Sequence, residues 1–192
     1  MATGYYTIAL PTKPYIKKYL QSLYGSPLIF DRENFFGTSI LGFLDKRFYT
    51  HQSSSLSYRH FDNFSAILVI NMPGWWVKQA SIMLHMTEGN MINLNKHFEN
   101  RFEEDLVKFC IPLTVAGLEI KKSIELFCKI HDVKIGEESD DDITFDSILQ
   151  KHKRKRKKLH KIYCKFEPPK KLIAKPDFAA DILKEMGINL SL

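Results

Sequence analysis

Two short apolar segments, each closed by a proline, constrain the fold of this chain more than any other feature of its sequence. They are YYTIALP at residues 5–11 and AILVINMP at residues 66–73. Apolar residues at alternate positions are typical of a strand that buries one face, and a proline cannot donate the hydrogen bond that continues a central strand. We therefore expect residues 6–10 to pair antiparallel with residues 68–72, in the same chain or in a partner chain.

The pattern after each strand is the same, namely a helix, a glycine and a second helix. In the first half, Ile16, Leu20 and Leu23 share one face of a helix that ends at Gly25. The second helix is expected at about residues 32–48, a serine-rich linker at 50–63, and the two helices after the second strand at 74–89 and 90–109. The predicted fold is mainly α with a short two-stranded antiparallel β ribbon, an α+β fold. Its two halves could be an internal repeat, or two unrelated stretches that share one core.

The first half also has the order of elements of a known family. The stretches TIALPTKPYIKKYLQSLYG and FFGTSILGFLDKRF place a strand ending in proline before two helices. Residues 4–48 thereby resemble the ribbon-helix-helix family of DNA-binding regulators, and residues 66–109 follow the same order. In that family the ribbon lies in the DNA major groove.

The resemblance assigns a direction to each strand residue. It implies that Tyr6, Ile8, Leu10, Leu68, Ile70 and Met72 point into the core. It implies that Tyr5, Thr7, Ala9, Ile67, Val69 and Asn71 point outward, towards the bases. A purely structural ribbon is the alternative, because Ile67 and Val69 cannot form hydrogen bonds with base edges.

The C-terminal third is expected to contain two amphipathic helices. The apolar face of the first consists of Ile120, Ile124, Phe127, Cys128 and His131. Asp142 or Thr144 can cap the second, whose inward residues are expected to be Phe145, Ile148, Leu149 and His152. The expected domains are residues 1–110, a helical domain at 111–166, and a C-terminal extension at 167–192 with a short helix at about 177–186.

The second of these helices continues into a basic segment, KHKRKRKK at residues 151–158. Eleven of the 28 Lys and Arg residues lie between residues 151 and 171, where Glu167 is the single acidic residue. Charge concentrated in one segment favours a polyanionic partner, whereas an evenly basic surface could serve solubility alone. The acidic segment GEESDDD at residues 136–142 could hold the basic helix against the protein until a partner competes for it.

Residues 112–158 resemble a helix-turn-helix of the Trp repressor or DnaA C-terminal type, although the connection VKIGEESDDD is longer than the usual turn. The resemblance implies that the second helix enters the major groove. Candidates to approach bases or phosphates are Ser147, Gln150, Lys151 and Arg154. Candidates for phosphate contacts are Lys153, Lys155, Arg156, Lys157, Lys158 and Lys161.

Two groups of residues have spacings found in catalytic or metal sites, and each also has a simpler interpretation. Glu119-Ile120-Lys121, with Asp105 upstream, has the E-x-K form of many metal-dependent nucleases, but those enzymes need it on a strand. Cys128, His131, His160 and Cys164 have pair spacings that suit zinc, yet the first two fall on the apolar face of a helix. Phosphate-binding loop and serine-nucleophile motifs are absent from the sequence. We therefore predict no catalytic residues, no metal and no cofactor.

The remaining features concern the setting of the protein. The three cysteines lack C-x-x-C spacing, no apolar stretch reaches the length of a membrane span, and no secretory signal pattern begins the chain. A cytoplasmic, nucleoid-associated location is expected, without membrane association. The predicted function is non-catalytic binding of duplex DNA or RNA by a regulator or accessory factor of phage or mobile-element type, as a homodimer. The alternative is a structural or assembly protein whose basic segment docks on an acidic protein.

Overall fold

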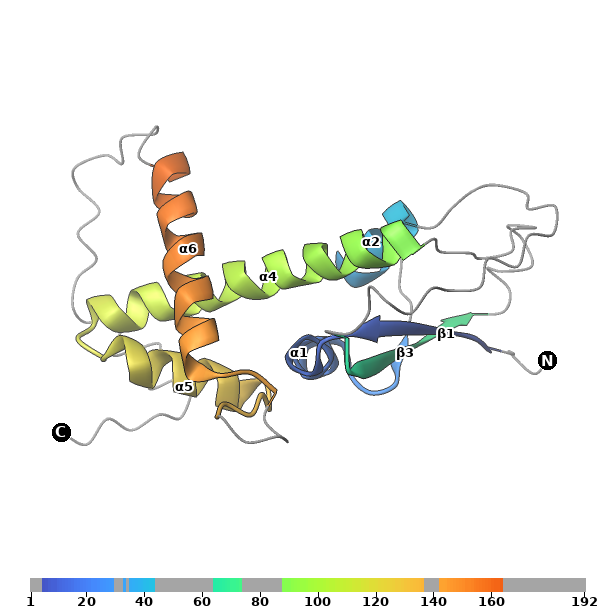
Figure 1. The fold of residues 1–192 in the computed structure, drawn as a ribbon, viewed down its shortest axis with the longest axis horizontal. Helices are drawn as coiled ribbons and strands as arrows, with labels where there is room; N and C mark the ends of the chain where they lie inside the picture. Colours follow the sequence, from blue (N-terminus) through green and yellow to red (C-terminus); the bar gives the residue numbers. More distant parts are fainter. Residues whose placement is uncertain are drawn as a thin grey trace. The chain divides into compact units, whose positions relative to one another are not determined.

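The computed structural model describes residues 5–29, 33, 35–43, 64–73, 88–136 and 142–163 (Figure 1). Within these ranges the chain is mainly helical, with five helices and a small sheet of three strands. The chain divides into two compact units, residues 1–102 with 131–133, and residues 103–130 with 134–192. No helix in the described ranges is both long and apolar enough to cross a membrane.

The sheet of the first unit pairs the two predicted strands in the predicted register. β1 (Tyr5–Thr12) and β3 (Ala66–Pro73) are antiparallel within one chain, with Tyr6 opposite Met72 and Leu10 opposite Leu68. The expected two-stranded ribbon is nevertheless wrong, because β2 (Leu28–Ile29) adds a third strand, parallel to β3. A strand of two residues is too short to leave a periodic pattern in the sequence.

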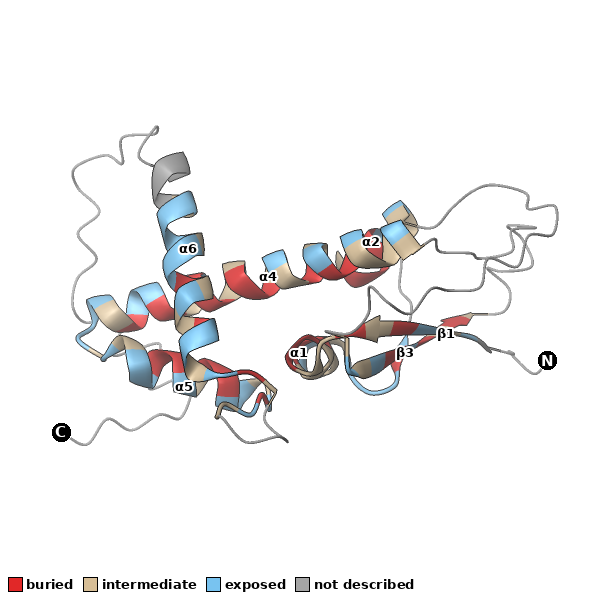
Figure 2. Ribbon diagram, viewed as in Figure 1, coloured by how far each residue is buried: buried red, intermediate tan, exposed pale blue. Residues whose placement is uncertain are grey.

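The two faces of the sheet differ as the alternation predicted. Leu10, Leu68, Ile70 and Met72 are buried, whereas Thr7, Ala9, Ile67 and Val69 are exposed. Ile8, predicted inward, and Asn71, predicted outward, are both half-buried, and the side chains of Tyr5 and Tyr6 lie outside the described residues. Figure 2 shows this change of burial along β1 and β3. Neither strand contains a charged residue. The inner face therefore contributes to the core, and the outer face offers no cation to a polyanion.

Helix α1 (Pro14–Tyr24) packs against the inner face of the sheet. It starts with proline, whose fixed φ suits the first turn, and it ends at Gly25, whose φ of 84° is unfavourable for other residues. Ile16 and Leu20 are buried as predicted. Leu23 was expected on the same buried face but is 44% exposed, because it lies in the last turn of the helix, beyond the core that the earlier turns fill.

Helix α2 (Phe35–Phe43) lies within the helix predicted at about residues 32–48 and buries Phe36 and Ile40. The ring of Phe36 stacks on Tyr24 and Phe98 at centroid distances of 5.4 and 5.8 Å. The predicted linker at 50–63 and most of the predicted helix at 74–89 lie outside the described residues. The internal repeat is therefore not confirmed.

Helix α4 (Glu88–Val115) is longer than the sequence suggested and contributes residues to both units. A domain boundary was expected after residue 110, but the helix continues through Cys110 and Pro112. Pro112 lies only one turn before the helix end, where the loss of one N–H donor is tolerated more easily than in the middle. Gly117, with a φ of 94°, follows the helix, and the Leu118 N–H donates to the Leu113 carbonyl at 2.9 Å.

Polar contacts fasten α4 to β1 in the first unit. The Thr12 hydroxyl donates to Asn95 Oδ1 at 2.6 Å, and Asn95 Nδ2 donates to the carbonyls of Pro11 and Met91 at 2.8 and 3.0 Å. Thr12 and Asn95 are both buried. Because buried polar groups cost free energy unless they are paired, this network specifies the register between the helix and the strand.

The second unit packs α5 (Ile120–Ile130) and α6 (Phe145–Tyr163) against residues 103–115 of α4. Ile124, Phe127 and Cys128 are buried on the predicted face of α5. His131, predicted on the same face, instead follows the last residue of the helix in a turn. The helix cap is Thr144, whose Oγ1 accepts from the Ser147 N–H at 3.3 Å.

Candidate nucleic-acid interface

The entire basic segment from Lys151 to Lys158 lies in α6, so its charges have fixed positions on a helix. One side of α6 is anchored, because Ile148 is fully buried and His152 is only 2% exposed. Ile148 and His152 were both predicted to point inward, whereas Phe145 and Leu149, predicted on the same side, are only half-buried. The orientation of α6 within the second unit is therefore set by Ile148 and His152.

Three basic side chains of α6 form ion pairs with α4, and we call Lys151, Arg154 and Lys155 the anchored cations. Glu103 accepts from Arg154 Nη2 at 2.5 Å and from Lys151 Nζ at 3.3 Å. Glu104 lies 2.8 Å from Lys155 Nζ. The side chains of Lys151 and Lys155 are only 17% and 11% exposed, whereas that of Arg154 is 58% exposed. Part of the basic segment is thus neutralised by the protein itself.

The carboxylate of Glu103 is the centre of this network. Its side chain is 5% exposed, and a buried carboxylate is tolerated only when cations and donors surround it. The position of Glu103 on α4, one turn before Leu106 and Val107, lies on the buried side of the helix. A charged residue on an apolar stripe of the predicted helix is the signal in the sequence that identifies Glu103 as a candidate for such a contact.

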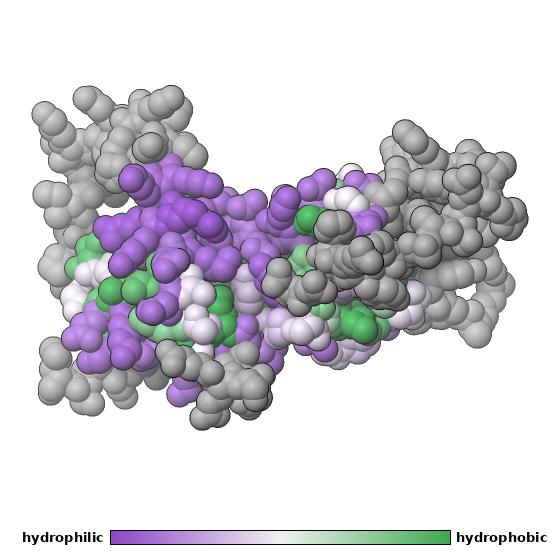
Figure 3. All heavy atoms as spheres, viewed as in Figure 1, coloured by the Kyte–Doolittle hydropathy of each residue, from purple (hydrophilic) through white to green (hydrophobic). Residues whose placement is uncertain are grey.

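The other four basic residues, the outer cations, are Lys153, Arg156, Lys157 and Lys158. All four are exposed and form no ion pair with another residue in the part of the chain that the structure describes. Figure 3 shows hydrophilic side chains gathered over α6. Together with the exposed part of Arg154, they place five cations within six residues, or about 7.5 Å of helix.

The other residues predicted to contact nucleic acid are Ser147, Gln150 and Lys161. Ser147 and Gln150 are exposed, but the Ser147 N–H and hydroxyl both contact the capping Thr144. The backbone of Lys161 belongs to α6, while its side chain lies outside the description. The acidic segment at residues 136–142 was expected to hold the basic helix until a partner competes for it. Residues 137–141 of this segment lie outside the described residues. Asp142 Oδ2 accepts from the Lys134 N–H at 2.7 Å.

His152 combines burial with an unpaired nitrogen. Its Nε2 is buried without a hydrogen-bond partner in the described structure. Burial, and secondly the positive charge of Arg156, lower the pKa of His152 from its usual value of 6.5. The imidazole therefore stays neutral in the folded protein at pH values where an unfolded chain would bind a proton.

Stability should consequently fall as the pH is lowered through 6.5. Below that pH the unfolded state binds a proton at His152 that the folded state does not, so the free energy of unfolding decreases by up to about 1.4 kcal/mol per pH unit until the folded pKa is reached. Urea unfolding at pH 7 and pH 5 measures this decrease. In His152→Leu the free energy of unfolding should decrease less between these two pH values, because the substitution removes this imidazole. An equal decrease in the variant and the wild type would contradict the prediction.

Of the four residues considered for zinc, the structure describes the side chains of Cys128 and His131 but not that of His160. Burial raises the pKa of the Cys128 thiol to about 12, and the neighbouring Cys110 is also a buried free thiol. His131 Nδ1 lies 2.6 Å from Ser22 Oγ, and its ring packs on Tyr19. Cys164 lies outside the described residues. Within the described ranges, no group of three His, Cys, Asp or Glu side chains is arranged to hold a metal ion.

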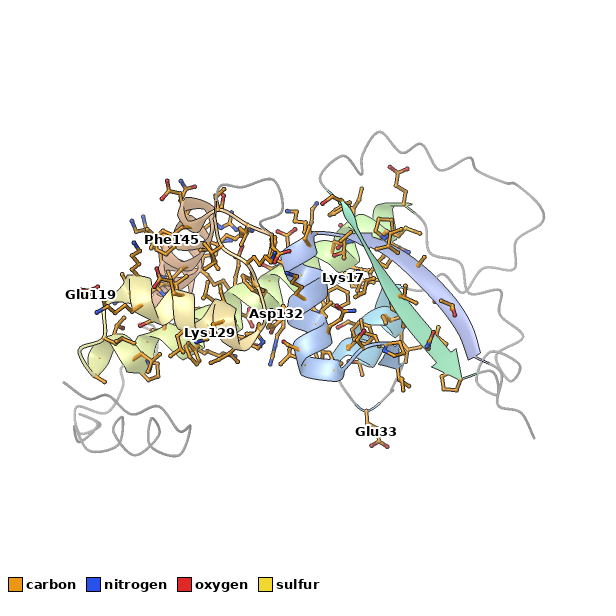
Figure 4. The ribbon with its side chains drawn as sticks, turned by 90° about the horizontal axis from the view of Figure 1, so that it is seen from below. Lys17, Glu33, Glu119, Lys129, Asp132 and Phe145 are labelled. Atoms are coloured by element: carbon orange, nitrogen blue, oxygen red, sulfur yellow. The ribbon has the colours of Figure 1, made fainter. Side chains whose placement is uncertain are left out.

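The E-x-K sequence is not on a strand. Glu119 immediately precedes α5, and Lys121 lies in its first turn, with Nζ 5.7 Å from the centre of the Phe145 ring. Figure 4 shows Glu119 beside α5 and Phe145 at the start of α6. Asp105, the third residue considered, belongs to α4. The strand geometry that the nuclease interpretation needs is therefore absent at this sequence.

Comparison with known proteins adds no assignment to this geometry, since no family model, curated protein or solved structure matches the chain.

Proposed function

We propose that this protein binds the phosphate backbone of duplex DNA through the exposed side of α6. The observation that carries the proposal is the division of the basic segment into anchored cations, paired with α4, and outer cations, which face solvent from the same helix. The buried residues Ile148 and His152 hold the helix in one orientation. Cations presented at fixed positions can contact several phosphates with a smaller loss of conformational entropy than a flexible tail.

The proposed activity is binding without catalysis, as in a regulator or an accessory factor. Phosphates require only positive donors at the surface, so the proposal does not include reading of base sequence. The sheet is not part of the proposed interface, because β1 and β3 contribute no charged side chain. Selection from random duplex DNA should accordingly yield weak sequence preference.

The salt dependence of binding tests the proposal quantitatively. If Arg154 and the outer cations neutralise five phosphates, log affinity should fall against log salt with a slope of about −4.5. A slope of about −6 would mean that Lys151 and Lys155 also bind phosphates, after breaking their ion pairs with Glu103 and Glu104. The measurement is a fluorescence-anisotropy titration of the full chain with a duplex between 50 and 300 mM salt, with duplex RNA in parallel.

Two results would count against the proposal. Tighter binding to duplex RNA would move the partner class to RNA. An absence of salt-dependent binding to either duplex would reject the nucleic-acid function. The basic helix would then be better explained as a docking site for an acidic protein.

A further inference from the structure

We propose that Arg154 is a phosphate ligand whose guanidinium is oriented by Glu103, so that Glu103 is a positioning residue of the interface. The inference rests on the proposed function and assigns unequal roles to cations that charge alone would make equivalent. It predicts that the identity of the side chain at residue 154 matters, whereas at Arg156 only the positive charge matters.

The contacts of Arg154 differ from those of the other anchored cations. Its Nη2 donates to Glu103 at 2.5 Å while 58% of the side chain remains exposed. Lys151 and Lys155 also contact acidic residues of α4, but they are 17% and 11% exposed. Among the three, Arg154 is therefore the residue that can keep its contact with the protein and still reach a ligand in solvent.

The chemistry of the guanidinium makes this double contact feasible. A guanidinium has five N–H donors in a rigid plane, and a bond from Nη2 to Glu103 leaves other donors directed elsewhere. Planar donors match the geometry of phosphate oxygens in bidentate contacts. A lysine at this position would have one flexible ammonium group and would have to divide it between Glu103 and the phosphate.

Glu103 could act in the opposite sense, as an anion that competes with phosphate for Arg154. The buried position of its carboxylate argues against competition, because release of Arg154 would leave a carboxylate of 5% exposure with fewer cations around it. Retention of the Glu103–Arg154 bond during binding avoids this cost. The two roles predict opposite effects when the charge of Glu103 is removed.

Arginine-to-lysine exchange at two positions tests the role of Arg154. Arg154→Lys should lower duplex affinity about five- to tenfold with little change in the salt slope, because the charge is kept and the bidentate contact is lost. Arg156→Lys is the matched control, since Arg156 is exposed on the same helix and forms no ion pair with another described residue. Its affinity should change less than about twofold. Equal effects of the two exchanges would overturn the inference.

Removal of one acidic charge at two neighbouring positions tests the role of Glu103. Glu103→Gln should lower affinity about threefold because Arg154 loses its orientation, whereas Glu104→Gln should leave it unchanged or raise it slightly. In an Arg154→Lys background, Glu103→Gln should cause no further loss, because the oriented contact is already gone. Higher affinity of Glu103→Gln in the wild-type background would show competition and refute positioning.

These experiments separate the inference from the function on which it rests. Wild-type protein without salt-dependent duplex binding would reject the proposed function and the inference together. Normal wild-type binding with equivalent Arg154→Lys and Arg156→Lys variants would reject the inference alone. Thermal melts establish that each variant is folded at the assay temperature. If Glu103→Gln does not fold, the comparison of the two arginine exchanges still decides the question.

Discussion

A variant in which Lys153, Arg156, Lys157 and Lys158 are replaced by alanine is expected to bind duplex DNA about a thousandfold more weakly than the wild type at 0.15 M salt. Each neutralised phosphate releases counterions, so the loss of four contacts should reduce the slope of log affinity against log salt from about −4.5 to about −1. The fold should persist, since the four side chains are exposed and alanine is a favourable helix residue. Anisotropy titrations and a thermal melt measure both effects.

The matched control removes two anchored cations instead. Lys151→Ala with Lys155→Ala deletes positive charge from the same helix, but these side chains contact Glu103 and Glu104. The control should therefore lose stability while keeping a salt slope close to −4.5, apart from a small long-range effect of the lower net charge. The opposite result is a salt slope that changes by the same amount for each cation removed, whether anchored or outer. Total charge would then determine binding, and the distinction between anchored and outer cations would not matter for function.

The sequence predicted the local structure of α6 well. Ile148 and His152, two of the four residues predicted to point inward from α6, are buried, and the capping role of Thr144 was one of two alternatives. Both inferences depend on neighbours within one or two helical turns, where spacing determines which side chains share a face. The helical state of the basic segment followed from the same argument.

The partners of the basic segment could not be read from local spacing. Glu103 contacts Lys151 across 48 residues of sequence, and such a pairing depends on how α4 and α6 pack. The acidic segment at residues 136–142 lies closer to the basic segment in sequence than Glu103 does.

In the small sheet, too, the sequence predicted local patterns but not contacts between distant residues. The long strands β1 and β3 were predicted with their register and their buried faces, because eight residues leave a readable pattern. β2 was missed, since a strand of two residues is specified by its partner β3 rather than by its own sequence. The contact between Thr12 and Asn95 was missed as well, because it joins residues 83 positions apart.

One aromatic side chain of α4 makes two ring contacts in the core of the first unit. Phe102 is fully buried, and its ring meets the edges of Tyr15 and Tyr19 of α1 at centroid distances of 5.1 and 5.2 Å. Both tyrosines are themselves buried. Phe102 therefore joins α4 to α1 through two edge-to-face contacts in addition to its own burial.

Phe102→Ala is expected to lower the free energy of unfolding by about 3–5 kcal/mol, because it removes a fully buried ring, leaves a cavity and deletes two aromatic contacts. Phe109→Ala is the matched control on the same helix, since Phe109 is only partly buried and, among the described residues, meets one ring, that of Phe127, at 5.5 Å. Its cost should be about half as large. Urea unfolding followed by circular dichroism measures both values, and equal costs would show that the two tyrosine contacts of Phe102 add nothing. At temperatures where Phe102→Ala remains folded, its affinity for duplex DNA should equal that of the wild type, because the proposed interface on α6 belongs to the other unit.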